Sequence, residues 1–175
     1  IRPAPDELPG RWLNGAQSYE TLAGVNAAME YLQSIGQDHP EYNSQFPQLT
    51  GRRQEIKAGM QAIRDYEATL TRKFLNDIST LPQYTVWGAK DEASDVWRVP
   101  TIAVSRDGEK SNDIALYLAA NKVNIWSRSV YSISLSERLD LEKTGGFIRV
   151  GLVHYNTPEE IDRLLELLDS YKKTY

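Results

Sequence analysis

The chain has 175 residues, of which 41% are apolar and 25% charged, so its size and composition are those of one ordinary domain with a hydrophobic core. The net charge of −4 argues against a nucleic-acid-binding surface, because such surfaces need an excess of cationic side chains. The chain has no cysteine, which excludes catalysis by a thiol, disulfide bonds and thiolate metal ligands. The two histidines, His39 and His154, do not have the spacing of a metal site, so no bound metal is expected.

No apolar run approaches the ~20 residues that a membrane-spanning helix needs, and the N-terminal residues lack the basic and apolar segments of a signal peptide. We therefore expect a soluble, cytoplasmic protein that has no membrane partner. Residues 1–17 are rich in proline and have no periodic pattern, which is typical of an extended segment. This segment is expected to be a connection from a larger preceding domain.

Apolar residues then repeat at helical spacing in two stretches. The first predicts a helix over 18–35 that ends at Gly36 and carries a stripe formed by Leu22, Val25, Met29 and Leu32. A polar loop follows as far as residue 47. The second stretch predicts a helix over 50–80, which at 1.5 Å per residue is about 45 Å long. Such a helix either spans two domains or is one long core helix, and the pattern does not choose between them.

The rest of the chain predicts a small α/β layer in which short strands and helices alternate. Strands are expected at 84–87, 99–104 and 123–126. A short helix is expected to begin at Ser111, whose side chain can cap it, and residues 131–139 are expected to form one or two further helical turns.

One arginine stands inside an apolar strand near the C-terminus. Phe147, Ile148, Val150 and Val153 surround Arg149 and predict a buried or half-buried strand. A guanidinium group is always charged, and burying it without a partner costs several kcal/mol, so Arg149 needs an anionic partner. That partner is either a ligand or an internal carboxylate such as Asp140 or Glu142.

The strand leads directly into a strongly marked helix start. Thr157 is placed to cap the helix, Pro158 suits its first position, and Glu160 completes a capping box. The positions that follow form one apolar stripe, made of Ile161, Leu164, Leu165, Leu168 and Tyr171. This last helix is therefore expected to lie on the sheet that contains Arg149.

Three passages resemble a known family. They are residues 15–32 (GAQSYETLAGVNAAMEYL), 124–131 (NIWSRSVY) and 147–161 (FIRVGLVHYNTPEEI). The resemblance is to the C-terminal part of class V aminotransferases, in the cysteine-desulfurase-like branch of fold-type I pyridoxal-phosphate enzymes.

The resemblance implies an α/β (α+β) fold, with a short, mostly antiparallel sheet, helices packed on one of its faces, and a long N-terminal helix. It also implies that residues 48–175 form the small C-terminal domain. Residues 18–47 would lie on the side of the large domain and the dimer partner, and residues 1–17 would connect to the large domain.

Two groups of residues acquire a role by this resemblance. The arginine at the position of Arg149 binds the α-carboxylate of an amino-acid substrate through two parallel hydrogen bonds. The turn Gly15-Ala16-Gln17 corresponds to the place where a threonine reaches the cofactor phosphate across the dimer. Because Ala16 replaces that threonine, only the backbone or Gln17 can make this contact, and a plain helix start is an equally good interpretation.

The chain also departs from the family pattern. The loop after Ile125 has no cysteine, which excludes a persulfide-forming reaction. A related branch without this cysteine often has a Gly-His pair where this chain has Arg128 and Ser129, so the substrate stays open. No lysine has the context of the Schiff-base lysine, which belongs to the preceding large domain.

We therefore expect no catalytic residue in this chain, and pyridoxal phosphate only in a full-length, homodimeric transferase or lyase that acts on a small amino acid. Two alternatives remain, namely a free-standing module in which Arg149 binds a small carboxylate and an oligomerisation domain that uses the long helix. If the chain is part of a larger enzyme, the stripe on the first helix or part of the long helix should be exposed, whereas a self-contained module would cover it.

Overall fold

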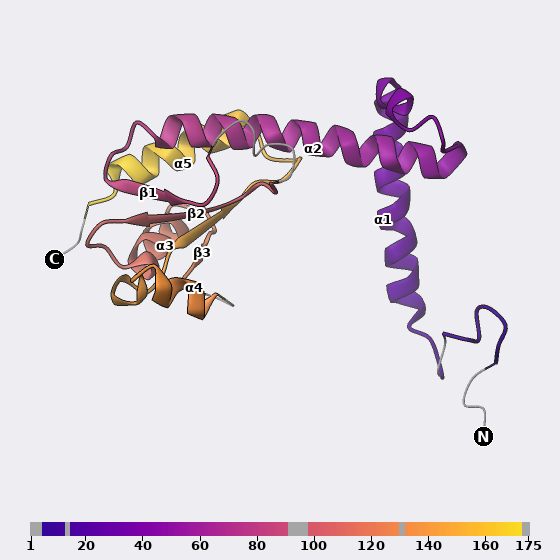
Figure 1. The fold of residues 1–175 in the computed structure, drawn as a ribbon, viewed down its shortest axis with the longest axis horizontal. Helices are drawn as coiled ribbons and strands as arrows, with labels where there is room; N and C mark the ends of the chain where they lie inside the picture. Colours follow the sequence, from indigo (N-terminus) through magenta and orange to yellow (C-terminus); the bar gives the residue numbers. More distant parts are fainter. Residues whose placement is uncertain (1–4, 13–14, 91–97, 130–131, 173–175) are drawn as a thin grey trace. The chain divides into compact units, whose positions relative to one another are not determined.

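A computed structural model describes most of the chain (Figure 1), namely residues 5–12, 15–90, 98–129 and 132–172. Residues 1–4 and 13–14 of the expected N-terminal connection and residue 131 of an expected helix lie outside this part. The chain divides into two compact units, Ile1–Ala62 and Ile63–Tyr175. Within the described ranges, no helix is both long and apolar enough to cross a membrane.

The long helix expected within 50–80 is present as α2, Gly51–Ile78. It runs through the boundary between the two units. Its first part buries the small residues Ala58, Gly59 and Ala62. Its second part buries the large residues Leu70, Phe74 and Ile78. The buried residues of α2 thus fall in both units.

The first unit also contains α1, Tyr19–Asp38, and a 3₁₀ helix, η1, Pro40–Gln45. The prediction that Gly36 ends the first helix is wrong, because α1 continues through Gly36 to Asp38. Gly36 serves a different purpose, since a Cβ atom there would lie 1.8 Å from the carbonyl oxygen of Glu55 on α2. A Cβ atom on Gly59 would lie 2.2 Å from the carbonyl oxygen of Leu32. The two glycines therefore allow the backbones of α1 and α2 to meet.

The stripe predicted on α1 is largely exposed. Leu22 is 51% exposed, Val25 57% and Met29 38%, while Leu32 is half-buried. The buried residues described in the first unit are Gly36, Ala58, Gly59 and Ala62. An exposed stripe is the outcome expected for a part of a larger protein, and not for a self-contained module.

The second unit is built on a four-stranded sheet. Its strands are β1 (Tyr84–Trp87), β2 (Thr101–Arg106), β3 (Trp126–Ser127) and β4 (Ile148–Gly151). Their order in the sheet is β1-β2-β4-β3, and each neighbouring pair is antiparallel. The predicted fold class, with a short antiparallel sheet, is therefore confirmed. Of the three strand predictions for 84–87, 99–104 and 123–126, the last is the least accurate, because strand pairing begins only at Trp126.

The helical elements of this unit, besides the end of α2, are α3 (Ser111–Ala120), α4 (Ile133–Arg138), η3 (Glu142–Thr144) and α5 (Pro158–Ser170). Ser111 does not cap α3 as expected, because Lys110 occupies the N-cap position. The Ser111 hydroxyl instead donates a hydrogen bond to the Gly145 carbonyl (2.7 Å) and accepts one from the Arg128 amide (3.3 Å). Its buried side chain thus joins two loops.

The start of α5 is the one predicted. Thr157 Oγ1 accepts a hydrogen bond from the Glu160 amide, and the Glu160 carboxylate accepts one from the Thr157 amide. Asn156 donates a further hydrogen bond to the same carboxylate (2.9 Å). These two donors, with Asn156 contributing more than Thr157, lower the pKa of Glu160 below its usual value.

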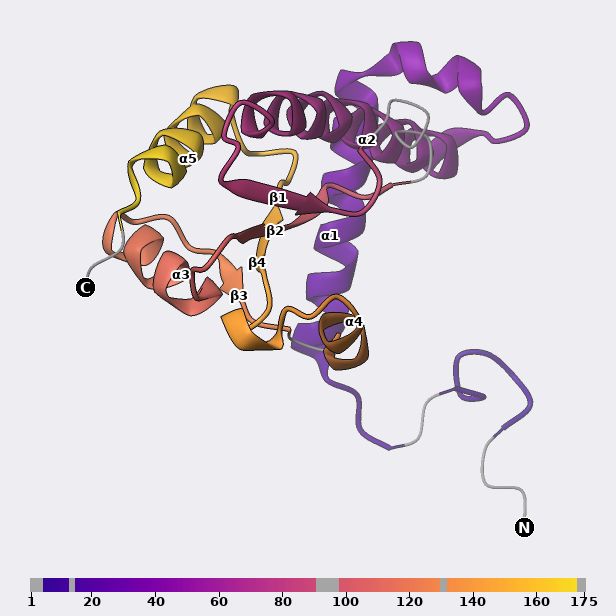
Figure 2. The same cartoon turned by 60° about the vertical axis from the view of Figure 1, so that its left-hand side comes forward.

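One face of the sheet carries the hydrophobic core. Figures 1 and 2 show α2 and α5 side by side over the sheet. The helices contribute Leu70, Phe74 and Ile78 from α2, Ile114 and Leu118 from α3, and Ile161, Leu164 and Leu168 from α5. The sheet contributes Ile102, Val104, Ile148 and Val150. The helices that build the described core thus pack on one face of the sheet, as expected.

Candidate anion-binding site

The strand register aligns one row of side chains on the face opposite the core. Trp87 of β1 lies opposite Ala103 of β2, Ala103 lies opposite Arg149 of β4, and Arg149 lies opposite Trp126 of β3. Residues paired across antiparallel strands point to the same face. The four side chains therefore form a continuous row, with Arg149 beside a tryptophan of the edge strand.

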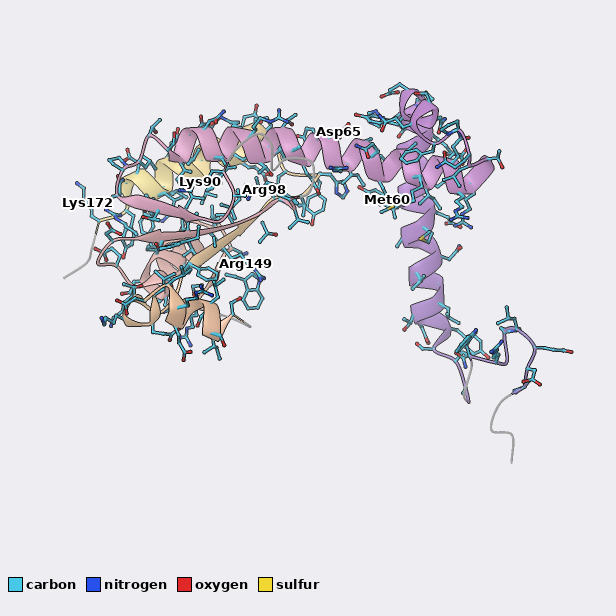
Figure 3. All side chains as sticks on the ribbon, viewed as in Figure 1. Met60, Asp65, Lys90, Arg98, Arg149 and Lys172 are labelled. Atoms are coloured by element: carbon cyan, nitrogen blue, oxygen red, sulfur yellow. The ribbon has the colours of Figure 1, made fainter. Side chains whose placement is uncertain are left out.

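The side chain of Arg149 is exposed to solvent. On β4, Ile148 and Val150 are buried in the core, whereas Arg149 and Gly151 are exposed. The predicted half-buried strand is therefore confirmed, but the arginine itself lies on its exposed side, because side chains alternate along a strand. The labelled side chain is visible on the sheet in Figure 3.

The guanidinium group of Arg149 contacts an aromatic ring. Its Cζ atom lies 6.0 Å from the centroid of the Trp126 ring, which is within the range of a cation–π interaction. Of the internal partners considered, Asp140 pairs with Lys143 at 3.4 Å. Within the described part of the chain, no carboxylate forms an ion pair with Arg149. Among the described residues, neither of the two internal carboxylates considered in the sequence analysis is paired with Arg149.

A cavity of about 220 Å³ opens at this row. The residues that line it are Trp87, Thr101, Ala103, Trp126, Arg128, Ser132, Phe147 and Arg149. This lining combines two guanidinium groups, two hydroxyl groups and three aromatic rings, and none of its described residues is acidic. Such a set suits a small anion that also has an apolar part.

One wall of the cavity is held in a fixed orientation. The indole Nε1 of Trp87 donates a hydrogen bond to the Ser105 hydroxyl at 2.8 Å. Phe147 is only 7% exposed, so its ring is packed into the protein. The cavity therefore has at least two side chains whose positions do not depend on a ligand.

Arg128 is a lining residue that the sequence prediction missed. It follows β3 directly and has a φ of 76°, in the left-handed region that favours glycine. Gly146 faces it, and a Cβ atom on Gly146 would lie 2.6 Å from the Ser129 amide nitrogen and 2.8 Å from the Arg128 carbonyl carbon. The one available signal was the departure from the family pattern at Arg128 and Ser129.

Gly15, Ala16 and Gln17 lie in the first unit, in the turn before α1. Gly15 has a φ of 86°, and the Gln17 side-chain amide donates a hydrogen bond to the Gly15 carbonyl at 2.9 Å. Ala16 is exposed and offers no polar side-chain atom. The structure describes this turn and Arg149 each within its own unit. The turn fits a phosphate contact through the backbone and a plain helix start equally well.

The described residues contain no cluster of three or more His, Asp or Glu side chains that could hold a metal ion. Lys73 pairs with Asp162 and Asp77, and these contacts, that of Asp162 above all, raise its pKa. A lysine held in its charged form by two carboxylates is a poor candidate for a nucleophilic amine, which must be neutral to react.

The sequence profile of the aminotransferase class-V family matches residues 54–164. The aminotransferase-like protein FGM3 of Gibberella zeae is 30% identical over 115 residues, which are 65% of this chain and 28% of that protein. A probable cysteine desulfurase of Synechocystis is 24% identical over 164 residues, which are 94% of this chain and 32% of that protein. The chain spans between 28% and 37% of the length of the curated relatives that it matches.

Solved structures share the fold. A cysteine desulfurase from Thermococcus onnurineus aligns with a TM-score of 0.55 and 16% identity, over 66% of this chain and 29% of that chain. The cysteine desulfurase CsdA of Escherichia coli aligns with a TM-score of 0.52 and 15% identity, again over 66% and 29%. At such identities the likeness concerns the fold alone.

Proposed function

This chain belongs to the class-V aminotransferase family, and from that membership we propose that it is the C-terminal part of a pyridoxal-phosphate-dependent enzyme acting on an amino acid. Two observations support a part rather than a whole enzyme. The chain spans at most 37% of the length of its curated relatives, and the apolar stripe on α1 is exposed. A large domain that precedes it, and a second copy in a homodimer, would be its partners.

Arg149 carries the proposal. Its guanidinium group faces a small cavity, and no carboxylate of the described residues pairs with it. A guanidinium group is a planar fork of donors that matches a carboxylate with two parallel hydrogen bonds. The proposed role is to bind the α-carboxylate of the substrate.

The residues present in this chain fit the substrate better than the cofactor. Gly15 and Gln17 offer only backbone amides and one side-chain amide to a phosphate group, and among the described lysines none lines the Arg149 cavity. When bound to the complete enzyme, pyridoxal phosphate supplies an electron sink for bonds at the substrate Cα atom. This chain is therefore proposed to orient the substrate, and to contribute no catalytic residue.

The side chains around Arg149 would orient the bound substrate. The Trp126 ring beside the guanidinium group restricts where the fork can point, and the Trp87 ring limits the far side of the cavity. A carboxylate held at two points fixes the direction of the attached Cα atom. The reaction that follows, whether transamination, elimination or racemisation, would be decided by residues of the large domain.

Substitution tests this role in the full-length protein reconstituted with pyridoxal phosphate. We expect Arg149→Ala to lower kcat/KM for amino acids by roughly 10- to 100-fold, because it removes a charge-assisted pair of hydrogen bonds. The visible absorbance of the bound cofactor should stay. Arg138→Ala is a matched control, because Arg138 is exposed on α4 and does not line the cavity. Unchanged kinetics in the Arg149 variant would assign this arginine to the protein surface.

A further inference from the structure

We propose that Arg128 is a second anion-binding residue of the same cavity, and that the substrate is an amino acid with a carboxylate on its side chain. The inference rests on the proposed role of Arg149, which would bind the α-carboxylate. Arg128 would bind the second carboxylate and so determine which amino acid is accepted.

The charges in the cavity support this assignment. Arg128 and Arg149 both line it, one directly after β3 and the other on the neighbouring strand β4. No described lining residue is acidic, so two positive charges share a small, partly aromatic space. A ligand with two negative groups matches them, whereas a ligand with one leaves the second guanidinium group without a counter-charge. A volume of about 220 Å³ is below that of most drug-sized pockets, so only a small ligand fits.

The backbone at Arg128 strengthens the argument. With a φ of 76°, it adopts a conformation that disfavours any residue with a Cβ atom. The loop does not need the side chain, because the contacts that fix this position use the backbone: the Arg128 amide donates to Ser111, and Ser111 donates to Gly145. Glycine would meet the same contacts without strain. A strained residue that lines a binding cavity is a reasonable candidate for a functional one.

A structural use of the Arg128 side chain is the competing explanation. Arg128 also borders a neighbouring hollow that contains Glu142, Lys110 and Lys143. Within the described residues, no ion pair joins Arg128 to Glu142. Of the two lysines in this hollow, Lys143 pairs with Asp140, and Lys110 is available to balance the Glu142 carboxylate. Glu142→Gln therefore provides a control for any effect that passes through this hollow.

Succinate and butyrate are matched probes, because both have four carbon atoms and they differ by one carboxylate. We would measure the binding of each to the full-length protein by calorimetry. The unmodified protein is expected to bind succinate at least about tenfold more tightly than butyrate, since a charge-assisted hydrogen bond is worth this factor or more. Arg128→Gly should remove most of this preference, Arg128→Lys should retain part of it, and Glu142→Gln should leave it unchanged.

Stability provides an independent readout. Arg128→Gly relieves the left-handed strain, so its melting temperature should be equal to or higher than that of the unmodified protein. A loss of succinate binding together with retained stability would separate ligand binding from folding.

Each other outcome has a definite meaning. If Arg128→Gly keeps the preference for succinate while Arg149→Ala weakens both probes, the second site is wrong and the proposed function stands. If Arg149→Ala changes the binding of neither probe, the proposed function itself is wrong. If inorganic phosphate binds as tightly as succinate and depends on both arginines, the cavity is a phosphate site, and the dicarboxylate assignment is overturned.

Discussion

A single glycine across the loop determines whether Arg128 can take its position. Gly146 has a φ of 86°, and a Cβ atom on it would lie 2.6 Å from the Ser129 amide nitrogen. We expect Gly146→Ala to destabilise the protein by about 1–3 kcal/mol, because it adds both a left-handed strain and a backbone clash. Thermal unfolding would measure the effect.

Gly151 is the matched control, since it lies on β4 and a Cβ atom added there would have no neighbouring atom within 4 Å. Gly151→Ala should be neutral or slightly stabilising, because alanine loses less entropy on folding. Equal losses of stability in the two variants would show that the contact with the Arg128 loop is unimportant.

Single residues also show how much of the site could be predicted from the sequence. Arg149 stood out because its neighbours in the chain are apolar, but those neighbours face the core and Arg149 does not. Trp87 and Trp126 were not recognised as site residues, since they join Arg149 only through the pairing of strands that are distant in the sequence. Register between such strands depends on the whole sheet and cannot be read from one segment.

At the level of elements, the crossing of α1 and α2 depends on glycine at one position and not at another. Gly36 meets the backbone of α2, whereas Gly24 on the same helix has no atom within 4 Å of a Cβ position. We expect Gly36→Ala to destabilise the helix pair by roughly 1–3 kcal/mol through overpacking. Gly24→Ala should stabilise it by about 1 kcal/mol, since alanine is the better helix former.

Circular dichroism at 222 nm during thermal unfolding would follow both variants. Opposite shifts of the helical transition are the expected result. If Gly36→Ala is as well tolerated as Gly24→Ala, the close approach of α1 to Glu55 is not needed for stability.

These elements also show which local signals are reliable. The start of α5 was predicted correctly because its cap is made by residues three positions apart. Ser111 was assigned wrongly as a cap because its actual partners, Gly145 and Arg128, lie far away in the sequence. Gly36 was read as a helix end because a glycine that ends a helix and one that lets two helices touch look alike in one sequence.

On the scale of the whole molecule, the hydrophobic core is unevenly divided. The core cluster, from Leu70 to Tyr171, lies entirely in the second unit. The buried residues described in the first unit are two glycines and two alanines, which bury little apolar surface. The free energy of local unfolding should therefore be lower in the first unit than in the second, because few apolar contacts must be broken to open it.

Hydrogen exchange on the isolated 175-residue chain would measure this difference. We expect the amides of α1 to exchange at least about tenfold faster than those of α5, because α1 has an exposed stripe and α5 buries Ile161, Leu164 and Leu168. Both helices report from one sample, so α5 is an internal control. Equal protection that weakens on dilution would mean that copies of the chain cover the stripe, and equal protection at every concentration would contradict the view that α1 needs a missing partner.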